Sequence, residues 1–462
     1  MRTYPRAKCA AIALLAVALG CSSSPKHDYL WRSARPLGAE ATAARPPLDP
    51  APAVPSSEAE AAVEAPASLT LDAAVGLALA GSPELAAAGW DVRVAEAAAW
   101  QAGFRSNPEI AIESEKILGS GGRSGFDSAA ASMTLEYTLP LGGKRGKRVS
   151  AADAQGRLMA WDYEAARLDI YTDTRKAFLA AVVAQEREAL AVRTVELAVG
   201  ALDTVTAQVA AGRSPAIERT RAEMAVVEAE SVLRTSGNAV SASYSALAAR
   251  WGATVVNFER VDGALTPPVE PPPAAEARNG LAQAPALARY SDALDALDSA
   301  VAVADAEGAP DIGVGVGGQY SRDVKERSFL IELGIPLPVF DTNQGGVAEA
   351  RAAAAKGRME LRHALATTHA TFERAYSDLL SAYHEAVTTR DELMPRAQEL
   401  LDKTMAGYKA GKFRYFDALA AQEEFVETQE ADLQARAAYA MALAEVERLI
   451  ARELHDTESA AE

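Results

Sequence analysis

Four short segments alternate apolar residues with polar residues or glycines, which is the period of a β-strand with two unlike faces. The first two lie within 107–139, where isoleucines alternate with glutamates and then leucines with threonines and a glutamate. The other two lie within 311–335, where valines alternate with glycines before a second mixed run begins. We therefore predict two strand pairs, each with one apolar face and one polar or glycine-rich face.

Each strand pair is followed by an alanine-rich stretch with the period of an amphipathic helix. The first stretch, 147–251, turns back at Gly212-Arg213-Ser214-Pro215, and the second, 347–450, turns back at Gly411. The ascending arm of the first stretch has about 65 residues, or roughly 100 Å at about 1.5 Å per residue. The pattern predicts a mainly α protein with a small β part and two long helical hairpins.

The order of helix, strand pair and helical hairpin occurs twice along the chain. Pro83 and Pro108 in the first half recur as Pro285 and Pro310 at one common displacement, which indicates an internal duplication. The predicted segments are a signal peptide at 1–20, a Pro/Ala-rich arm at 21–67, a first repeat at 68–265, a linker at 266–275, a second repeat at 276–451 and a tail at 452–462.

The first residues resemble a bacterial lipoprotein signal. Three basic residues precede an apolar run that is too short to span a bilayer and that ends in Leu19-Gly20-Cys21. Such a sequence predicts lipidation of Cys21, and Ser22 directly after it favours sorting to the outer membrane. The alternative is a plain signal peptide with an incidental cysteine. No run of about 18 apolar residues follows, so no transmembrane helix is predicted.

The apolar faces of the strand pairs need a cover, because isolated strand pairs are marginal in water. If lipid covers them, every backbone group must be paired by closing the strands into a barrel. Four strands cannot close, since the smallest membrane barrels have about eight, so the chain must associate with copies of itself. Two copies would leave too narrow a pore, whereas three would share a twelve-stranded barrel. The predicted lumen is lined by Glu113, Thr134, Glu136 and Glu332.

Composition narrows the function classes further. The net charge of −17 argues against nucleic acid, because phosphate binding needs clustered basic residues. The five histidines are scattered, so we expect no metal site and no cofactor in this chain. Gly313-Val314-Gly315-Val316-Gly317-Gly318 formally fits a dinucleotide fingerprint, but its glycines lie inside a predicted strand instead of after one. No nucleophile–base motif is present, and we predict that the chain is not an enzyme.

Several short motifs resemble the outer-membrane efflux proteins of the TolC type. They are Leu69-Thr70-Leu71-Asp72, Ser82-Pro83-Glu84-Leu85, Asn107-Pro108-Glu109, Pro336-Leu337-Pro338-Val339-Phe340-Asp341 and Gly407-Tyr408-Lys409-Ala410-Gly411-Lys412. The basic corner Gly142-Gly143-Lys144-Arg145-Gly146-Lys147-Arg148 is similar to the heavy-metal efflux branch of that family, the CusC/CzcC branch.

The resemblance implies a homotrimer whose twelve-stranded barrel in the outer membrane continues as an α-helical barrel across the periplasm. It also implies a periplasmic adaptor protein and a proton-driven inner-membrane RND pump as partners, with the lipid of Cys21 in the inner leaflet of the outer membrane. The implied function is a passive exit duct, with heavy-metal cations favoured as cargo. The alternatives are a duct for drug efflux or type I secretion and, in a different class, a soluble periplasmic coiled-coil scaffold lipoprotein.

The tips of the two hairpins are the expected functional sites, since they would form the periplasmic mouth. By resemblance, Asp417 belongs to a ring of carboxylates that narrows the pore, and Glu218 of the other tip is placed with it. Ala420 departs from the family pattern, which has a second acidic residue there. The alternative for Asp417 is an ordinary solvated residue in a first helical turn.

Two further sets of residues are expected from the same resemblance. The adaptor contacts are expected at the tip residues Gly212, Arg213, Gly411 and Lys412. The corners where barrel strands meet helices are marked by Pro140, Lys144, Arg145 and Pro336. The basic corner residues would contact lipid headgroups or carboxylates of neighbouring subunits, or would simply be solvated, and the tip glycines would at least satisfy the turns.

Overall fold

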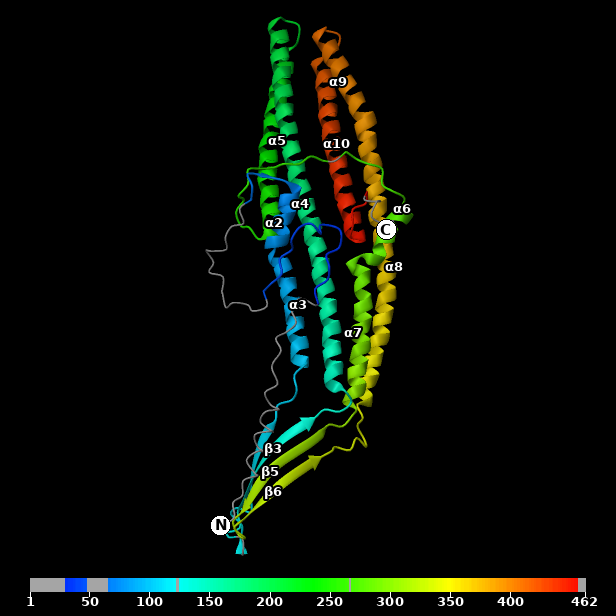
Figure 1. Ribbon diagram of the computed structural model, residues 1–462. Helices are drawn as coiled ribbons and strands as arrows, with labels where there is room; N and C mark the ends of the chain where they lie inside the picture. Colours follow the sequence, from blue (N-terminus) through cyan, green and yellow to red (C-terminus); the bar gives the residue numbers. More distant parts are fainter. Residues whose placement is uncertain (1–29, 48–64, 122–123, 266, 456–462) are drawn as a thin grey trace.

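A computed structural model describes residues 30–47, 65–121, 124–265 and 267–455. Long helices form a rod that carries a small sheet at one end and the tips of two helical hairpins at the other (Figure 1). The mainly α fold with a small β part is therefore as predicted. The predicted signal peptide and Cys21 lie outside the described residues.

The elements of the first half follow the predicted order of helix, strand pair and helical hairpin. They are β1 (Ser68–Leu69), α2 (Leu71–Gly81), α3 (Pro83–Ala102), β2 (Glu109–Glu115), β3 (Ala130–Leu139), α4 (Lys144–Ala210), α5 (Ala216–Ala248) and the 3-10 turn η2 (Ala249–Trp251). Thr70 and Ser82 begin α2 and α3 by accepting hydrogen bonds from Ala73 N and Leu85 N.

The second half contains the same order with one interruption. After β4 (Arg260–Val261), which closes the first half, the elements are α6 (Ala274–Ala277), η3 (Arg278–Gln283), α7 (Pro285–Glu307), β5 (Ile312–Ser321), β6 (Glu326–Gly334), α8 (Gln344–Thr388), the π-helical turn η4 (Thr389–Leu393), α9 (Met394–Lys409) and α10 (Tyr415–Ile450).

Two predicted helix boundaries were wrong. The ascending helix of the second hairpin was predicted to be continuous, but η4 interrupts it just before Pro395. Proline has no N–H to donate to the preceding turn and its ring crowds the carbonyl there, so a wider turn relieves the contact. The first long helix was predicted to begin at Lys147, but α4 begins at Lys144, which places Lys144 and Arg145 in its first turn.

The four long strands form one antiparallel sheet in the order β2-β3-β5-β6. The two predicted strand pairs are the outer halves of this sheet, and β3 joins them by pairing with β5 along its whole length. The strands lie next to one another below the helices (Figure 1). The glycine-rich run of the rejected dinucleotide motif lies within β5, as predicted.

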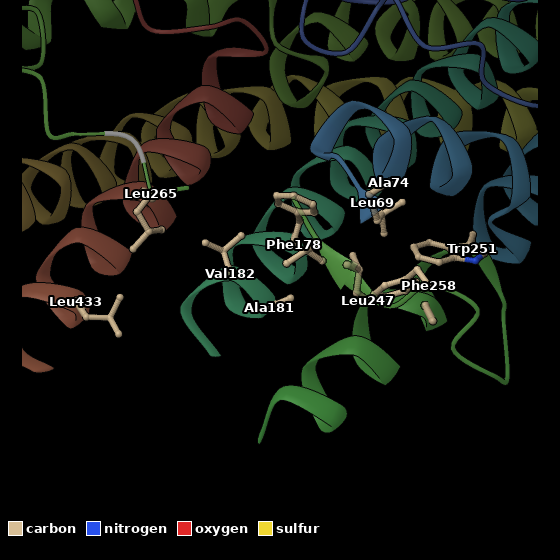
Figure 2. Packing of buried hydrophobic residues seen from close by; sticks show 13 residues of the cluster. Leu69, Ala74, Phe178, Ala181, Val182, Leu247, Trp251, Phe258, Leu265 and Leu433 are labelled. Carbon is tan, nitrogen blue, oxygen red and sulfur yellow. The ribbon is translucent and has the colours of Figure 1, made fainter. Parts of the chain in front are cut away.

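The largest buried cluster lies midway along the rod, where α4 passes β1 and β4. These two short strands pair in parallel, and Leu69 of β1 is fully buried. Phe178 of α4 packs in the same cluster as Trp251 and Phe258, and all three aromatic rings are at most 6% exposed (Figure 2). Gly263 makes room for this packing, because a Cβ there would lie 2.7 Å from Phe178 Cε1. The cluster joins the start of the first half to its end.

The described part of the predicted arm, 30–47, packs along the helices and is not a free tether. Arg167 of α4 is 1% exposed and forms a two-pronged ion pair with Glu164, at 2.9 and 2.8 Å. The same guanidinium donates to the carbonyl of Leu37 at 3.0 Å, and the backbone N of Arg35 donates to Glu164 at 2.7 Å. One buried ion pair thus holds the arm in place.

A second ion pair fastens the arm to both halves. Asp292 of α7 accepts hydrogen bonds from Arg157 Nε at 2.8 Å and Trp161 Nε1 at 2.7 Å, and it pairs with Arg32 of the arm. Burial raises the pKa of Asp292, but the hydrogen bonds and the two guanidinium charges outweigh it and hold the pKa below its ordinary value. The carboxylate therefore stays charged and links α4, α7 and the arm.

Among the described residues, no single helix is long and apolar enough to cross a membrane. Helices α2 and α3, bent by 43° where they meet, pass the same test of length and composition when taken together.

Replacing Arg167 by Met should release the arm and destabilise the rod. The change removes the donors that hold the arm and leaves Glu164 buried without its partner, which costs about 3–5 kcal/mol in comparable sites. Limited trypsin digestion should cut within 30–47 faster than in the wild type, and thermal unfolding should begin at a lower temperature.

The matched control is the double variant Glu164→Gln/Arg167→Met, which removes both charges. It should lose less thermal stability than Arg167→Met alone, while the arm still becomes sensitive to trypsin. An arm in Arg167→Met that resists trypsin as well as the wild type does would contradict this account.

Candidate functional site

One face of the sheet is apolar and open. Its register places Ile112 opposite Met133 and Leu135 opposite Val316, so the large apolar side chains of all four strands share this face. The outer strands are the most exposed, with Ile112 at 73% and Ile331 at 76%. A continuous apolar face of this kind marks a contact with lipid or with another protein.

The other face carries the predicted lumen residues. Glu109, Glu136, Gly315 and Glu332 occupy one row across β2, β3, β5 and β6. Gly315 has no side chain, which leaves room for the side chains of Glu136 and Glu332 on either side of it. A Cβ at position 315 would lie 3.3 Å from Glu332 Oε2. Glu109 was missing from the predicted set, although the alternation places it on the same face as Glu113.

The remaining predicted lumen residues lie on the same face in neighbouring rows. Glu113 is exposed and lies in the row of Ser132. Thr134 is 5% exposed, lies over Gly317, and donates a hydrogen bond from its hydroxyl to Glu136 at 3.3 Å. The structure therefore brings all four predicted lumen residues to one face, although Thr134 is covered.

The two outer strands of the sheet, β2 and β6, each have an unpaired edge within the described part of the chain. In a fully antiparallel sheet of four strands, the first and last strands run in opposite directions. The edge of β6 can therefore continue into the edge of a second β2 without changing the antiparallel pattern.

The first corner, between β3 and α4, is tightly held within the chain. Gly142 and Gly143 both have positive φ, 69° and 68°, which only glycine adopts freely. Lys144 is 5% exposed, and its Nζ lies 2.8 Å from Asp311 and 3.5 Å from Glu307.

Lys144 is therefore occupied within its own chain. Burial lowers the pKa of Lys144, but the hydrogen bond to Asp311 and the two nearby carboxylate charges outweigh it and raise the pKa above its ordinary value. Neither a headgroup contact nor a pair with another subunit is open to it here. Arg145 instead is exposed and reaches the carbonyl of Gly103 at 3.4 Å.

The second corner, between β6 and α8, is open and apolar. After Pro336 the chain exposes Leu337, Val339 and Phe340, the last at 92%. Asn343 directly precedes α8, has a φ of 60°, and donates from its Nδ2 to Ala304 O at 2.8 Å. The two corners thus differ in chemistry as well as in sequence.

The tips of the hairpins turn at the predicted glycines. Gly212 and Gly411 have φ values of 68° and 74°, and in each tip three residues lie between the glycine and the next helix. A side chain at either position would be strained in this conformation. Arg213 and Lys412, the other predicted contact residues, are exposed beside the two glycines.

The two predicted constriction residues have different surroundings. Asp417 is exposed in the first turn of α10, and its Oδ2 accepts a hydrogen bond from Arg414 N at 3.0 Å, so it also caps that helix. Glu218 is half-buried, and its Oε2 is covered without a hydrogen-bond partner among the described residues.

Glu218 lies by two tyrosines that join the tips. Tyr408 and Tyr415 are at most 3% exposed, with ring centroids 5.8 Å apart, in one cluster with residues of α4 and α5. Burial raises the pKa of the Tyr408 hydroxyl, the Ser214 side chain partly opposes this effect, and the charge of Glu218 raises the pKa again by less. In the sequence Tyr408 belongs to the motif that ends at Lys412, and nothing in that motif predicts its contact with Tyr415.

No cluster of three or more His, Cys, Asp or Glu side chains that could hold a metal ion occurs among the described residues. The arrangement that remains is one of surfaces: an apolar sheet face, a face with carboxylates, two corners and a pair of joined tips.

Comparison with known proteins agrees with this arrangement. The chain is 29% identical over 360 residues to the cobalt-zinc-cadmium resistance protein CzcC of Cupriavidus metallidurans, covering 78% of this chain and 84% of that protein. It is 26% identical over 292 residues to the nickel-cobalt-cadmium resistance protein NccC of Alcaligenes xylosoxydans xylosoxydans, covering 61% and 64%.

A solved structure shares the fold at lower identity. A crystal structure of CusC, described through the changes that accompany folding and transmembrane channel formation, matches with a TM-score of 0.70 at 15% identity. The match covers 82% of this chain and 91% of that one. The sequence model described as Outer membrane efflux protein matches residues 74–253 and 278–452, which is most of the chain. This chain belongs to the outer membrane efflux protein family.

Proposed function

We propose that three copies of this chain form a passive exit duct that carries heavy-metal cations across the outer membrane. The single observation that carries the proposal is the sheet. It has an exposed apolar face, a face with a row of carboxylates, and an unpaired strand at each edge within the described residues. A closed barrel shared between copies satisfies all three features at once.

The edges of the sheet favour three copies. Pairing β6 of one copy with β2 of the next extends the antiparallel order, and three sheets of four strands close into twelve. Two copies would give a barrel of about eight strands. The interior of such a barrel is nearly filled by side chains alone. The strands have 7 to 10 residues, close to the length of about 9–11 that tilted membrane strands need.

The carboxylate row favours cations as cargo. Glu109, Glu136 and Glu332 would repeat around the axis of the trimer, and rings of carboxylates attract cations and repel anions. The names of CzcC and NccC both describe resistance to cobalt and cadmium, which supports metal cations over drugs or secreted proteins as the cargo.

The long helices favour a duct that extends into the periplasm. α4 has 67 residues, or roughly 100 Å, and leads away from the sheet to the hairpin tips. We place the tips at a periplasmic mouth that docks an adaptor protein above an inner-membrane RND pump, which would supply the energy. Lipidation of Cys21 would add an anchor in the outer membrane.

The repeated order of elements favours an internal duplication. In both halves a helix, a strand pair and a helical hairpin follow one another, and the halves meet where β3 pairs with β5. We propose that one such unit was duplicated, and that the two corners and the two tips then diverged to serve different contacts.

The carboxylate row gives the first test of function. Glu136→Gln/Glu332→Gln should lower the preference for cations over anions in planar bilayers, because the charges are removed while size and hydrogen bonding are kept. The matched control Glu259→Gln changes an exposed carboxylate beside β4, outside the four-stranded sheet, and should leave the reversal potential unchanged.

The same variants should act on cargo in cells. In a strain that lacks the chain, the wild-type gene should restore tolerance of zinc, cobalt or cadmium, and the double variant should restore less of it. A wild-type gene that restores drug tolerance but no metal tolerance would contradict metal cations as the cargo.

Asp417 gives the second test, because two substitutions separate its two roles. Asp417→Asn removes the charge and keeps an oxygen that can accept from Arg414 N, whereas Asp417→Ala removes both. If the carboxylates narrow the pore, both variants should raise single-channel conductance, and only Asp417→Ala should lower the melting temperature. Unchanged conductance in both variants would leave Asp417 as a helix cap alone.

A further inference from the structure

The four-stranded sheet ends in two loops on the side away from the helices (Figure 1). One loop joins β2 to β3 and the other joins β5 to β6, and the backbone N of Arg322 connects the two loops by donating to Ala129 O at 2.9 Å. The loops and the strand ends beside them form what we call the far rim. Its exposed side chains include Lys116, Leu118, Phe126, Tyr320, Arg322, Val324, Lys325 and Arg327.

The two faces of the sheet carry opposite charges at the far rim. The last row of the apolar face consists of Ser114, Ala131, Tyr320 and Arg327. The charged side chain of that row is therefore basic. The neighbouring row, on the other face, carries the carboxylates of Glu115 and Glu326 at its two edges. Positive charge thus lies on the apolar face and negative charge on the face of the proposed lumen.

The basic side chains of the far rim are open to a partner. Arg322 and Lys325 lie in the turn between β5 and β6, and Arg327 is the second residue of β6. In the part of the chain that the structure describes, none of the three forms an ion pair. The two loops and the last row of the apolar face together carry four basic and two acidic residues among those described, although the whole chain has a net charge of −17. Such an excess of positive charge attracts an anion.

The two acidic residues of the loops, Asp127 and Asp323, do not cancel this excess. Asp323 accepts hydrogen bonds within its own turn, from Ser321 Oγ at 2.6 Å and from Val324 N at 2.8 Å. These two hydrogen bonds lower the pKa of Asp323, desolvation opposes them in part, and the charge of Lys116 lowers the pKa further. Even with both carboxylates charged, the far rim keeps its excess of positive charge.

Exposed apolar side chains continue the apolar face past its last row. Leu118 and Phe126 of one loop are 75% and 54% exposed, and Val324 of the other loop is 60% exposed. Leu118 and Lys325 have φ values of 57° and 54°, a conformation that is costly for residues with a side chain. Leu118 N donates to Gly125 O at 2.8 Å, which fixes the first loop in this shape. The loops therefore hold apolar side chains outward beside the basic ones.

The length of the strands would place the far rim at the headgroup level of a membrane. The eight residue steps from Ile312 to Tyr320 along β5 span about 26 Å at about 3.3 Å per residue. At a strand tilt of about 40° they would cover about 20 Å of an apolar band that is about 25 Å tall in membrane barrels. The apolar side chains of the loops would complete the band. Tyr320 and the basic residues would then lie at the interface, where tyrosine, lysine and arginine gather.

We propose that the far rim binds the phosphate group of a lipid headgroup, in the membrane leaflet away from the helices. The inference rests on the proposed duct, which puts the apolar face in lipid, and it names the lipid chemistry that this face selects. Arg327 and Lys325 pair with the phosphate oxygens, and the Tyr320 hydroxyl donates to them. The acyl chains of the same lipid cover Phe329, the next exposed ring of β6 on the apolar face. A lipid fits this surface because its anion and its apolar chains meet the same two features side by side.

The test titrates two lipids onto the purified full-length protein in mild detergent and counts the bound lipids by native mass spectrometry. Phosphatidic acid presents an open phosphate, whereas the choline of phosphatidylcholine neutralises the charge of its phosphate. Phosphatidic acid should bind more tightly than phosphatidylcholine. Lys325→Gln/Arg327→Gln should weaken the binding of phosphatidic acid at least about tenfold and leave the binding of phosphatidylcholine unchanged.

Matched controls separate the far rim from charge in general and from free phosphate. Lys356→Gln/Arg358→Gln removes two exposed charges of α8 and should leave the binding of phosphatidic acid unchanged. Glu326→Arg/Arg327→Glu exchanges the charges of the two faces at constant net charge and should abolish the preference for phosphatidic acid. Soluble glycerol 3-phosphate has the same phosphate without acyl chains, and at equal concentration it should not displace the lipid.

Several results would overturn the proposal. They are equal binding of the two lipids, unchanged binding in Lys325→Gln/Arg327→Gln or in the exchanged variant, an equal loss in the α8 control, and displacement by glycerol 3-phosphate. The same spectra give the number of chains, which separates this proposal from the duct. Three chains without a preference for phosphatidic acid would end the lipid recognition and leave the duct. A single chain that still prefers phosphatidic acid through Arg327 would end the association of copies and leave the recognition.

Discussion

The unpaired backbone of β2 and β6 is the constraint on which the other features of the molecule depend. A strand edge beside an exposed apolar face cannot be left open in lipid, because each unsatisfied N–H or C=O costs several kcal/mol there. In the proposed duct, pairing edge to edge between copies would remove the cost and, in the same step, would direct Glu136 and Glu332 to a shared interior. The proposed association, membrane insertion and lumen charge would thus have one cause.

The rest of the chain keeps this sheet in a usable position. The ion pair between Lys144 and Asp311 holds the start of α4 against the start of β5. The two halves of the sheet are therefore joined to each other at the end where they meet the helices. Arg167 binds the arm to α4 by a hydrogen bond to the carbonyl of Leu37, and Asp292 binds the arm to α7 by its ion pair with Arg32. These links join both halves of the chain. Among the long helices that the structure describes, the ascending helix of the second hairpin is broken by the π-helical turn before Pro395, on the tip side.

Local signals explain what the sequence could predict. Alternation with a period of two predicted all four strands and their faces, and the period of 3.6 predicted the long helices. Gly212 and Gly411 predicted the tips. Each of these signals depends only on residues that are neighbours in the sequence. Contacts between distant residues could not be found in this way. Nothing near Lys144 shows that its partner is Asp311, and nothing near Glu218 shows that it lies beside Tyr408. The docking of residues 30–47 likewise depends on Arg167. In the sequence, Arg167 is only one polar position in a helical pattern.

The central claim is that the sheet closes only between copies. The measurement that tests it most directly is the native mass of the protein extracted from membranes in mild detergent. The account predicts a particle of three chains that stays together without added partners. A particle that contains a single folded chain would contradict it, because the edges of β2 and β6 would then be satisfied in some other way.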